Sequence, residues 1–183
     1  MGERACSRCI AITKKGTRCS LNTCAVGPKC WMHTLADENL RVKQSHIKEA
    51  GKGLYPQKGF RPNKSNKSNE VVFKKGATIG PYTGKILSAE QVKRLPESKR
   101  TYILQQNPNR FIDAVKTNSG ATRYANDCRA SNKAKGQCKG NNAKFSNAKV
   151  KATKNIKNSE EIFVSYGANY WKKSKKKVGK MKK

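Results

Sequence analysis

Residues 111–132 read FIDAVKTNSGATRYANDCRASN, and this stretch decides the fold. It begins with a short β-like run, continues through a loop of turn residues, and then places Asn126, Asp127 and Cys128 in succession. The same alternation of short β-like runs and turn residues extends on both sides, from about Ser45 to Trp171. We therefore expect a mostly β domain with short strands and short helices.

Strands are predicted within seven runs, at 71–75, 77–84, 100–105, 110–115, 141–146, 149–154 and 160–167. One helix is predicted over 88–95, with Ser88 as its N-cap and Pro96 as its stop. The polar segments 61–69 and 136–142 are predicted to be exposed loops. Eight lysines among the last twelve residues, 172–183, predict a disordered tail.

Three further stretches accompany residues 111–132 in a fixed order. GKGLYP occupies 51–56, FKKGATIGPYTGKIL occupies 73–87, and KVKATKNIKNSEEIFVSYGANYW occupies 149–171. Together the four stretches resemble the SET domain of protein-lysine methyltransferases that use S-adenosyl-L-methionine (AdoMet). The resemblance implies a SET-domain β-clip fold of small sheets with a threaded pseudoknot. It also implies methyl transfer to lysines of a basic, nucleic-acid-associated protein, such as a histone or a viral DNA-packaging protein.

The resemblance assigns roles to single residues. It makes Tyr166 the catalytic residue, whose hydroxyl would orient the amine or favour methyl transfer electrostatically. It implies that the Asn126 side chain contacts the amino-acid portion of AdoMet and that the Asp127 backbone contacts the adenine edge. Glu161 is expected to be a structural partner inside the fold. The implied cofactor-binding set is Lys52, Gly53, Leu54, Tyr82, Arg123, Tyr124, Asn126, Asp127, Tyr166 and Trp171.

Some positions depart from the family pattern. Asp127 stands where His is usual, and a turn residue with a locally bonded side chain explains it as well as a cofactor contact does. The aromatic rings of Tyr82, Tyr124 and Trp171 suit a core role equally well. Val164 is small where the family often has an aromatic, which indicates room for more than one methyl. The other departures are Pro81, Lys85, Cys128, Arg129, Ser131, Ser159 and Ser165.

Five of the seven cysteines lie in the first 30 residues, close to His33. In a reducing compartment such clustering favours a metal over disulfides, and four ligands around zinc can fold a module that lacks a core. One ligand set is Cys9, Cys19, Cys30 and His33; another replaces Cys19 with Cys6. Reduced thiols without a metal are the alternative. Cys128 and Cys138 are predicted to be isolated thiols.

The stretch RCIAITKKGTRC at 8–19, followed by KCWMH at 29–33, resembles a small Cys/His module found in proteins of large DNA viruses. This resemblance favours Cys19 over Cys6 as a ligand. It leaves Cys6 and Cys24 without a role in the metal site.

The chain has 41 Lys and Arg against 11 Asp and Glu, a formal net charge of +30, which predicts nucleic acid as an electrostatic partner. No stretch approaches the roughly 18 apolar residues of a membrane span, and the N-terminus lacks the apolar run of a secretory signal. We expect an intracellular protein with no membrane partner, in the nucleus or on chromatin. If it is viral, the host nucleus, a replication compartment or the virion is expected.

The predicted organisation is a Cys/His zinc-binding module at 1–34, a helical linker at 35–50, a SET methyltransferase domain at 45–171 and a tail at 172–183. A homo-oligomer is compatible with this organisation. Two alternative functions stay open. One is a DNA- or RNA-binding packaging protein on a catalytically weak SET-like scaffold, and the other is an enzyme that mainly methylates its own tethered tail.

Overall fold

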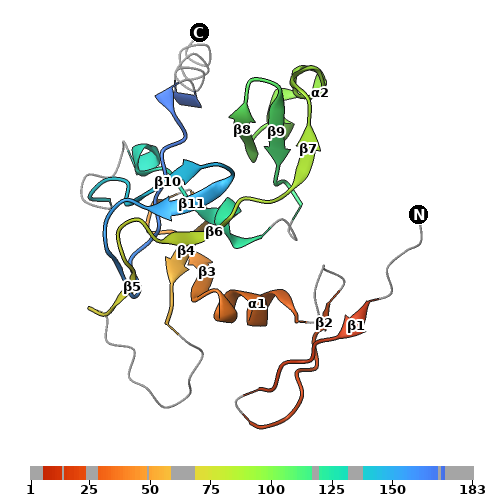
Figure 1. Ribbon diagram of the computed structural model, residues 1–183, viewed down its shortest axis with the longest axis vertical. Helices are drawn as coiled ribbons and strands as arrows, with labels where there is room; N and C mark the ends of the chain where they lie inside the picture. Colours follow the sequence, from red (N-terminus) through yellow and green to blue (C-terminus); the bar gives the residue numbers. More distant parts are fainter. Residues whose placement is uncertain are drawn as a thin grey trace.

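The computed structural model describes residues 6–13, 15–23, 29–48, 50–58, 69–116, 120–131, 138–168 and 170–171. These residues form small β-sheets and two short α-helices, which confirms the mostly β fold expected from the sequence. Figure 1 shows the N-terminal strands set apart from a larger body, with helix α1 between them. Within the described part of the chain, no helix is long and apolar enough to cross a membrane.

The N-terminal module contains little apolar core. Strands β1 (Ser7–Arg8) and β2 (Asn22–Thr23) pair antiparallel. The guanidinium groups of Arg8 and Arg18 donate to backbone carbonyls of the same module and so fix the loop between these strands. The buried cluster of the module consists of Cys9, Cys19 and Cys30, with Ala11 packed against it.

Helix α1 (Trp31–Asp37) connects the module to the body. It carries His33 beside Cys30, and it buries Leu35 in the main core of the body. The helix ends before Asn39, whose φ of 55° lies in the left-handed region that a continuing helix cannot use. The helical linker predicted over 35–50 is therefore wrong beyond Asp37.

Strand β3 (Leu40–Gln44) follows instead and pairs antiparallel with β4 (Lys52–Pro56). Leu40 and Val42 pack against the main core, whereas Arg41 lies on the opposite face. This alternation has the period of a strand, and burial of two alternating side chains outweighs the helical propensity of the surrounding polar residues.

The body contains three further antiparallel sheets. Strand β11 (Lys149–Ala152) lies between β6 (Thr78–Pro81) and β10 (Ala143–Ser146), and β5 (Val71–Phe73) pairs with β12 (Ile156–Lys157). Strand β9 (Arg110–Asp113) lies between β7 (Lys85–Leu87) and β8 (Ile103–Asn107). The main core is formed by Leu35, Leu40, Leu54, Phe73, Ile79, Ala121, Ala125, Ala143, Val150, Ala152, Ile156, Ile162 and Val164.

Most of the predicted strands are present, but 160–167 is not a regular strand. Its backbone divides its hydrogen bonds among several neighbours: the N–H of Ile162 donates to the carbonyl of Leu54, and that of Val164 to the carbonyl of Asn126. Residues 160–167 therefore have a β-like sequence but form an irregular segment that connects other parts of the fold. The short strands β7 and β12 were not predicted.

Helix α2 (Ala89–Arg94) forms where it was predicted. The Ser88 hydroxyl accepts from the Gln91 backbone N–H, and the Gln91 side chain accepts from the Ser88 backbone N–H, which is a complete capping box. A 3-10 helix, η1 (Glu97–Lys99), follows. The predicted loop at 136–142 has no buried residue over 138–142. Residues 61–68 and the predicted tail lie outside the described residues.

Candidate functional site

The candidate site lies where residues 121–131 meet residues 161–171. The first segment consists of two 3-10 helices, η2 (Ala121–Tyr124) and η3 (Cys128–Ser131), with Asn126 and Asp127 between them. A parallel bridge joins Asn126 to Phe163, and the N–H of Val164 donates to the Asn126 carbonyl at 2.8 Å. The resemblance implied that these two segments would meet, and the structure brings them together.

Tyr166 sits at this junction with its hydroxyl directed inward. The hydroxyl donates to the Ala125 carbonyl at 3.0 Å. Burial, reinforced by the nearby Tyr170 and Tyr82 hydroxyls and the Asp127 carboxylate, raises the pKa of Tyr166 above its ordinary value. The phenol is therefore neutral throughout the physiological pH range. It can orient a polar group, but it cannot serve as a phenolate base.

Asp127 holds the C-terminal segment in place. Its carboxylate is fully buried, and one oxygen, Oδ2, accepts from the Tyr166 backbone N–H at 2.8 Å and from the Trp171 indole N–H at 2.9 Å. The other oxygen, Oδ1, accepts from the Arg129 backbone N–H and from the Asn141 amide. The side chain of Asp127 thus acts as a bonded turn residue and as a link to the catalytic tyrosine predicted by the resemblance.

Asn126 is oriented by a second buried carboxylate. Its amide nitrogen lies within hydrogen-bond distance of the Lys52 carbonyl at 3.0 Å, Glu161 Oε1 at 3.1 Å and the Ser45 hydroxyl at 3.2 Å. The nitrogen therefore donates its hydrogen bonds within the protein, which leaves Oδ1 as the side-chain atom that can bond a ligand. No described residue bonds Asn126 Oδ1.

Glu161 lies inside the fold, as expected for a structural partner. Besides the Asn126 amide, its carboxylate accepts from the Ser45 hydroxyl at 2.7 Å, the His46 backbone N–H at 2.7 Å and the Tyr55 hydroxyl at 2.8 Å. Ser45, His46 and Tyr55 were not among the predicted site residues. Only the position of Tyr55 inside GKGLYP carried a signal, and nothing in the sequence indicated its partner.

The three predicted residues Lys52, Gly53 and Leu54 lie on β4. Gly53 and Leu54 are buried, whereas Lys52 is exposed and accepts from Asn126 through its carbonyl. A Cβ at Gly53 would collide with the Glu161 carboxylate, so any larger residue would push this carboxylate away. Glycine at position 53 therefore lets β4 approach the junction closely.

Tyr82, Arg123 and Tyr124 are engaged in packing. The Tyr82 hydroxyl donates to the Tyr102 carbonyl at 3.0 Å. The Arg123 guanidinium donates to the Ala114 and Val115 carbonyls and lies 4.0 Å from the Tyr102 ring centroid and 4.8 Å from that of Tyr124. These contacts support a core role for all three, while Tyr82 is close enough to contribute to the raised pKa of Tyr166.

Aromatic rings close the junction on its C-terminal side. The ring of Trp171 stacks on that of Tyr166 with centroids 6.3 Å apart, and Tyr170 packs edge-on against both. Aromatic faces suit a flat base and a cationic sulfonium. Val164 is completely buried in the main core.

The Cys/His cluster of the module forms a compact ligand set. The Sγ atoms of Cys9, Cys19 and Cys30 and one ring nitrogen of His33 all lie within 4.8 Å of one another. A tetrahedral zinc site, with Zn–S bonds of about 2.3 Å, separates its sulfur ligands by about 3.8 Å, so these four residues could hold one metal ion. The structure brings together the first of the two predicted ligand sets.

The environment of Cys9 favours the metal-binding thiolate. Burial acts to raise the pKa of the thiol, but backbone N–H donation from Cys30 and Ala11 and contacts with the neighbouring thiols lower this pKa below its ordinary value. The Cys30 N–H donates to Cys9 Sγ at 3.1 Å.

The prediction for Cys128 and Cys138 is wrong. Cys128 and Cys138 are joined by a disulfide rather than being isolated thiols, because the turn after Asp127 brings loop residues 138–141 back to Cys128. Cys6 is also disulfide-bonded and does not belong to the cluster of possible metal ligands, which agrees with the module resemblance and excludes the alternative ligand set. Cys24 lies outside the described residues.

Comparison with protein-family models matches residues 70–167 to the SET domain. The match covers more than half of the chain, and it includes the junction of Asn126, Asp127 and Tyr166. A comparison with curated proteins finds no match. The ordered motifs, the small sheets and this match agree: the chain belongs to the SET-domain family.

Proposed function

We propose that this protein transfers methyl groups from AdoMet to lysine side chains of a basic, nucleic-acid-associated protein, such as a histone or a viral DNA-packaging protein. Membership of the SET family, whose enzymes are AdoMet-dependent lysine methyltransferases, supports the reaction class. The observation that carries the proposal is the placement of Tyr166: it lies partly buried at the junction, with its backbone N–H bonded to Asp127 and its hydroxyl bonded to the Ala125 carbonyl.

The residues at the junction fit AdoMet chemically. Asn126 Oδ1 and the backbone of β4 offer polar contacts for the amino-acid end, and Tyr170 and Trp171 offer aromatic faces for the adenine. When bound, AdoMet supplies a methyl group on a positively charged sulfur. The protein itself then needs to position the amine and exclude water rather than form a covalent bond.

Tyr166 would orient the substrate amine. Its proton is held by the Ala125 carbonyl, so its oxygen is free to accept an N–H from a lysine amine. Free lysine has a pKa near 10.4 and must lose its proton before it can attack. Because the pKa of Tyr166 is raised, the phenol does not take this proton, which must leave to solvent. The proposed role of Tyr166 is therefore positioning and electrostatics.

The proposal is tested with purified full chain, labelled AdoMet and core histones. Wild type should transfer label, and Tyr166→Phe should lower kcat on the order of 100-fold while changing AdoMet affinity little. Tyr102→Phe is the matched control, because its hydroxyl donates to no described residue. If wild type binds DNA normally but labels no lysine-rich protein, the chain is a nucleic-acid-binding scaffold instead.

We also propose that the Cys/His cluster binds one structural zinc. Three thiolates and one imidazole satisfy zinc completely, which leaves no open position for a substrate or water. Elemental analysis of purified chain should find one zinc per chain. The absence of any bound metal, with the module still folded, would exclude this role.

The charge suggests how the enzyme reaches its substrate. A net charge of +30 repels a free lysine-rich protein, so we propose that DNA or RNA lies between the two and that the protein acts in the nucleus, on chromatin or in a viral replication compartment. Deleting 172–183 should flatten the salt dependence of DNA binding and leave turnover of a short peptide intact. Loss of peptide turnover would place the tail in the active site.

A further inference from the structure

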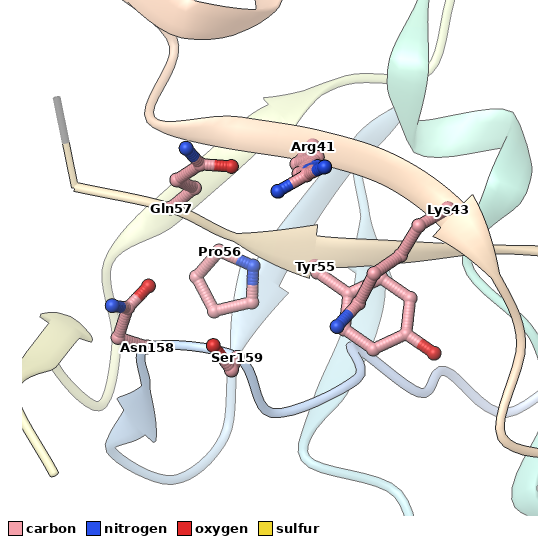
Figure 2. Close-up of a pocket in the computed structure, with 7 residues that line it drawn as sticks. All are labelled: Arg41, Lys43, Tyr55, Pro56, Gln57, Asn158 and Ser159. Carbon is pink, nitrogen blue, oxygen red and sulfur yellow. The ribbon is translucent and has the colours of Figure 1, made fainter. Parts of the chain in front are cut away.

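A shallow pocket of about 80 Å³ lies on the outer face of the β3–β4 pair (Figure 2). None of its lining residues belongs to the predicted cofactor-binding set. The pocket has room for a few water molecules or for one phosphate group. It is lined by Arg41, Lys43, Tyr55, Pro56, Gln57, Asn158 and Ser159.

The strand register places two cations on one side of this pocket. Arg41 lies directly opposite Tyr55 across the β3–β4 ladder, and Lys43 is two residues further along the same strand, so both side chains share a face. The Lys43 ammonium sits 4.0 Å from the Tyr55 ring centroid, which holds it over the pocket wall. No acidic residue lines the pocket, and the ion pairs among described residues do not involve Arg41 or Lys43.

Asn158 adds a side-chain amide to the wall of the pocket. The residue is only 4% exposed, and its backbone N–H donates to the Glu70 carbonyl at 2.7 Å. No described residue bonds its side-chain amide, which lines the pocket. In Figure 2 the amides of Asn158 and Gln57 and the guanidinium of Arg41 surround the ring of Pro56. A side-chain amide offers two N–H donors to an anion in the pocket.

Ser159 adds a hydroxyl to the pocket, and its backbone adopts a conformation that favours glycine. Its φ is 68°, in the left-handed region, and the SET pattern has glycine at this position. A serine here is strained, and its side chain lies at the pocket. The strain is consistent with a hydroxyl retained for binding.

We propose that this pocket binds a phosphate group of a nucleic-acid backbone. Two cations, two amides and a hydroxyl line the pocket and offer charged and neutral donors, which matches the oxygens of a phosphate. The open mouth of the pocket suits a phosphate within a chain, and the net charge of +30 favours a polyanion. The site is independent of methyl transfer, so its test does not depend on the proposed enzyme activity.

Direct binding is measured by NMR on the full chain, with inorganic phosphate and a short DNA duplex as separate probes. Both probes should shift the side-chain amide signals of Asn158 and Gln57, and Arg41→Gln/Lys43→Gln should abolish these shifts. Shifts spread evenly over surface lysines would overturn the proposal. Shifts with phosphate but not with DNA would make free phosphate the ligand and overturn the nucleic-acid assignment.

Duplex affinity against salt gives a second, quantitative test. Arg41→Gln/Lys43→Gln should lower the salt slope by about 0.9, the value for one phosphate, and weaken binding about ten-fold near 0.1 M salt. The control, Lys74→Gln/Lys75→Gln, removes the same charge from an exposed turn and should have a clearly smaller effect. Equal losses in both pairs would show diffuse attraction and contradict a built site.

The Ser159→Gly variant distinguishes a loss of DNA binding from a loss of stability. Glycine relieves the left-handed strain, so this variant should be at least as stable as wild type. It removes the hydroxyl without changing the charge, so duplex affinity should fall about three-fold at an unchanged salt slope. Unchanged affinity would remove Ser159 from the site and contradict the proposed donor set.

Discussion

The N-terminal module and the SET body are stabilised by different means. The module buries three cysteines and little else, while its Ile10, Ile12 and Leu21 are at least half exposed. The body buries a continuous apolar core and two fully bonded carboxylates, Asp127 and Glu161. A module without an apolar core depends on its ligand atoms, whereas the body can fold on burial alone.

Helix α1 belongs to both regions. His33 completes the ligand set of the module, and Leu35, two residues later, packs into the core of the body. The module is therefore attached to the body through packing as well as through the chain. Changes in metal content should reach the body through this helix.

Removal of the metal should have the largest effect. Structural zinc contributes about 10 to 16 kcal/mol of apparent binding energy in small modules, so Cys19→Ser should collapse the NMR signals of 7–33 and leave those of 70–167 in place. Met32→Ala is the control, because Met32 lies between two of the ligands on the chain but is exposed and is no ligand. Metal retained in Cys19→Ser would contradict the ligand assignment.

Ile162→Ala should destabilise the body and leave the module folded. Ile162 is fully buried in the main core, and truncation of such a side chain costs about 2 to 5 kcal/mol of unfolding free energy. Urea denaturation measures this loss, and metal stoichiometry should stay at the wild-type value. A loss of metal in this variant would show that the two regions fold as one unit.

Asp127→Asn should lower the free energy of unfolding by about 2 kcal/mol. It should also lower methyl-transfer activity by a larger factor than it lowers AdoMet affinity. The amide keeps one acceptor oxygen but turns N–H groups toward donors that need an acceptor, and so loosens the Tyr166 backbone and the Trp171 indole. The measurement is kcat against KM, with urea denaturation in parallel. An unchanged kcat would show that the Asp127 link does not position Tyr166.

Ser88→Ala should have the smallest effect, about 1 kcal/mol of unfolding free energy. Ser88 caps α2, which has no buried residue and lies outside both the metal cluster and the junction. Thermal denaturation reports the loss, and methyl transfer should be unaffected. A fall in activity would indicate that α2 takes part in substrate binding.

Sequence reasoning succeeded where local signals agreed with the tertiary context. Ser88 and Pro96 predicted α2, and the β-like runs predicted most strands of the body. It failed beyond Asp37, where apolar residues spaced among polar ones suggested an amphipathic helix but Leu40 and Val42 alternate along a strand. It also failed at 160–167, where the β-like pattern is real but no single neighbouring strand accepts its hydrogen bonds.

The candidate site was predictable as residue types and order, but its internal bonds were not. Motif spacing pointed to Asn126, Asp127 and Tyr166, and the structure joins them. The link from Asp127 to Trp171 and the four donors on Glu161 span long separations along the chain, and no local pattern encodes such contacts. The disulfide between Cys128 and Cys138 was missed although the sequence separation is only 10, because no local pattern showed that the chain returns to Cys128.

The central claim is that the catalytic site lies at the junction in the body and that the module takes no part in it. An NMR titration of the full chain with S-adenosyl-L-homocysteine tests this claim directly. We predict saturable shifts at 52–54, 126–127 and 166–171, with the signals of 7–33 unchanged. Shifts confined to the module, or no binding at all by a chain that is folded, would contradict it.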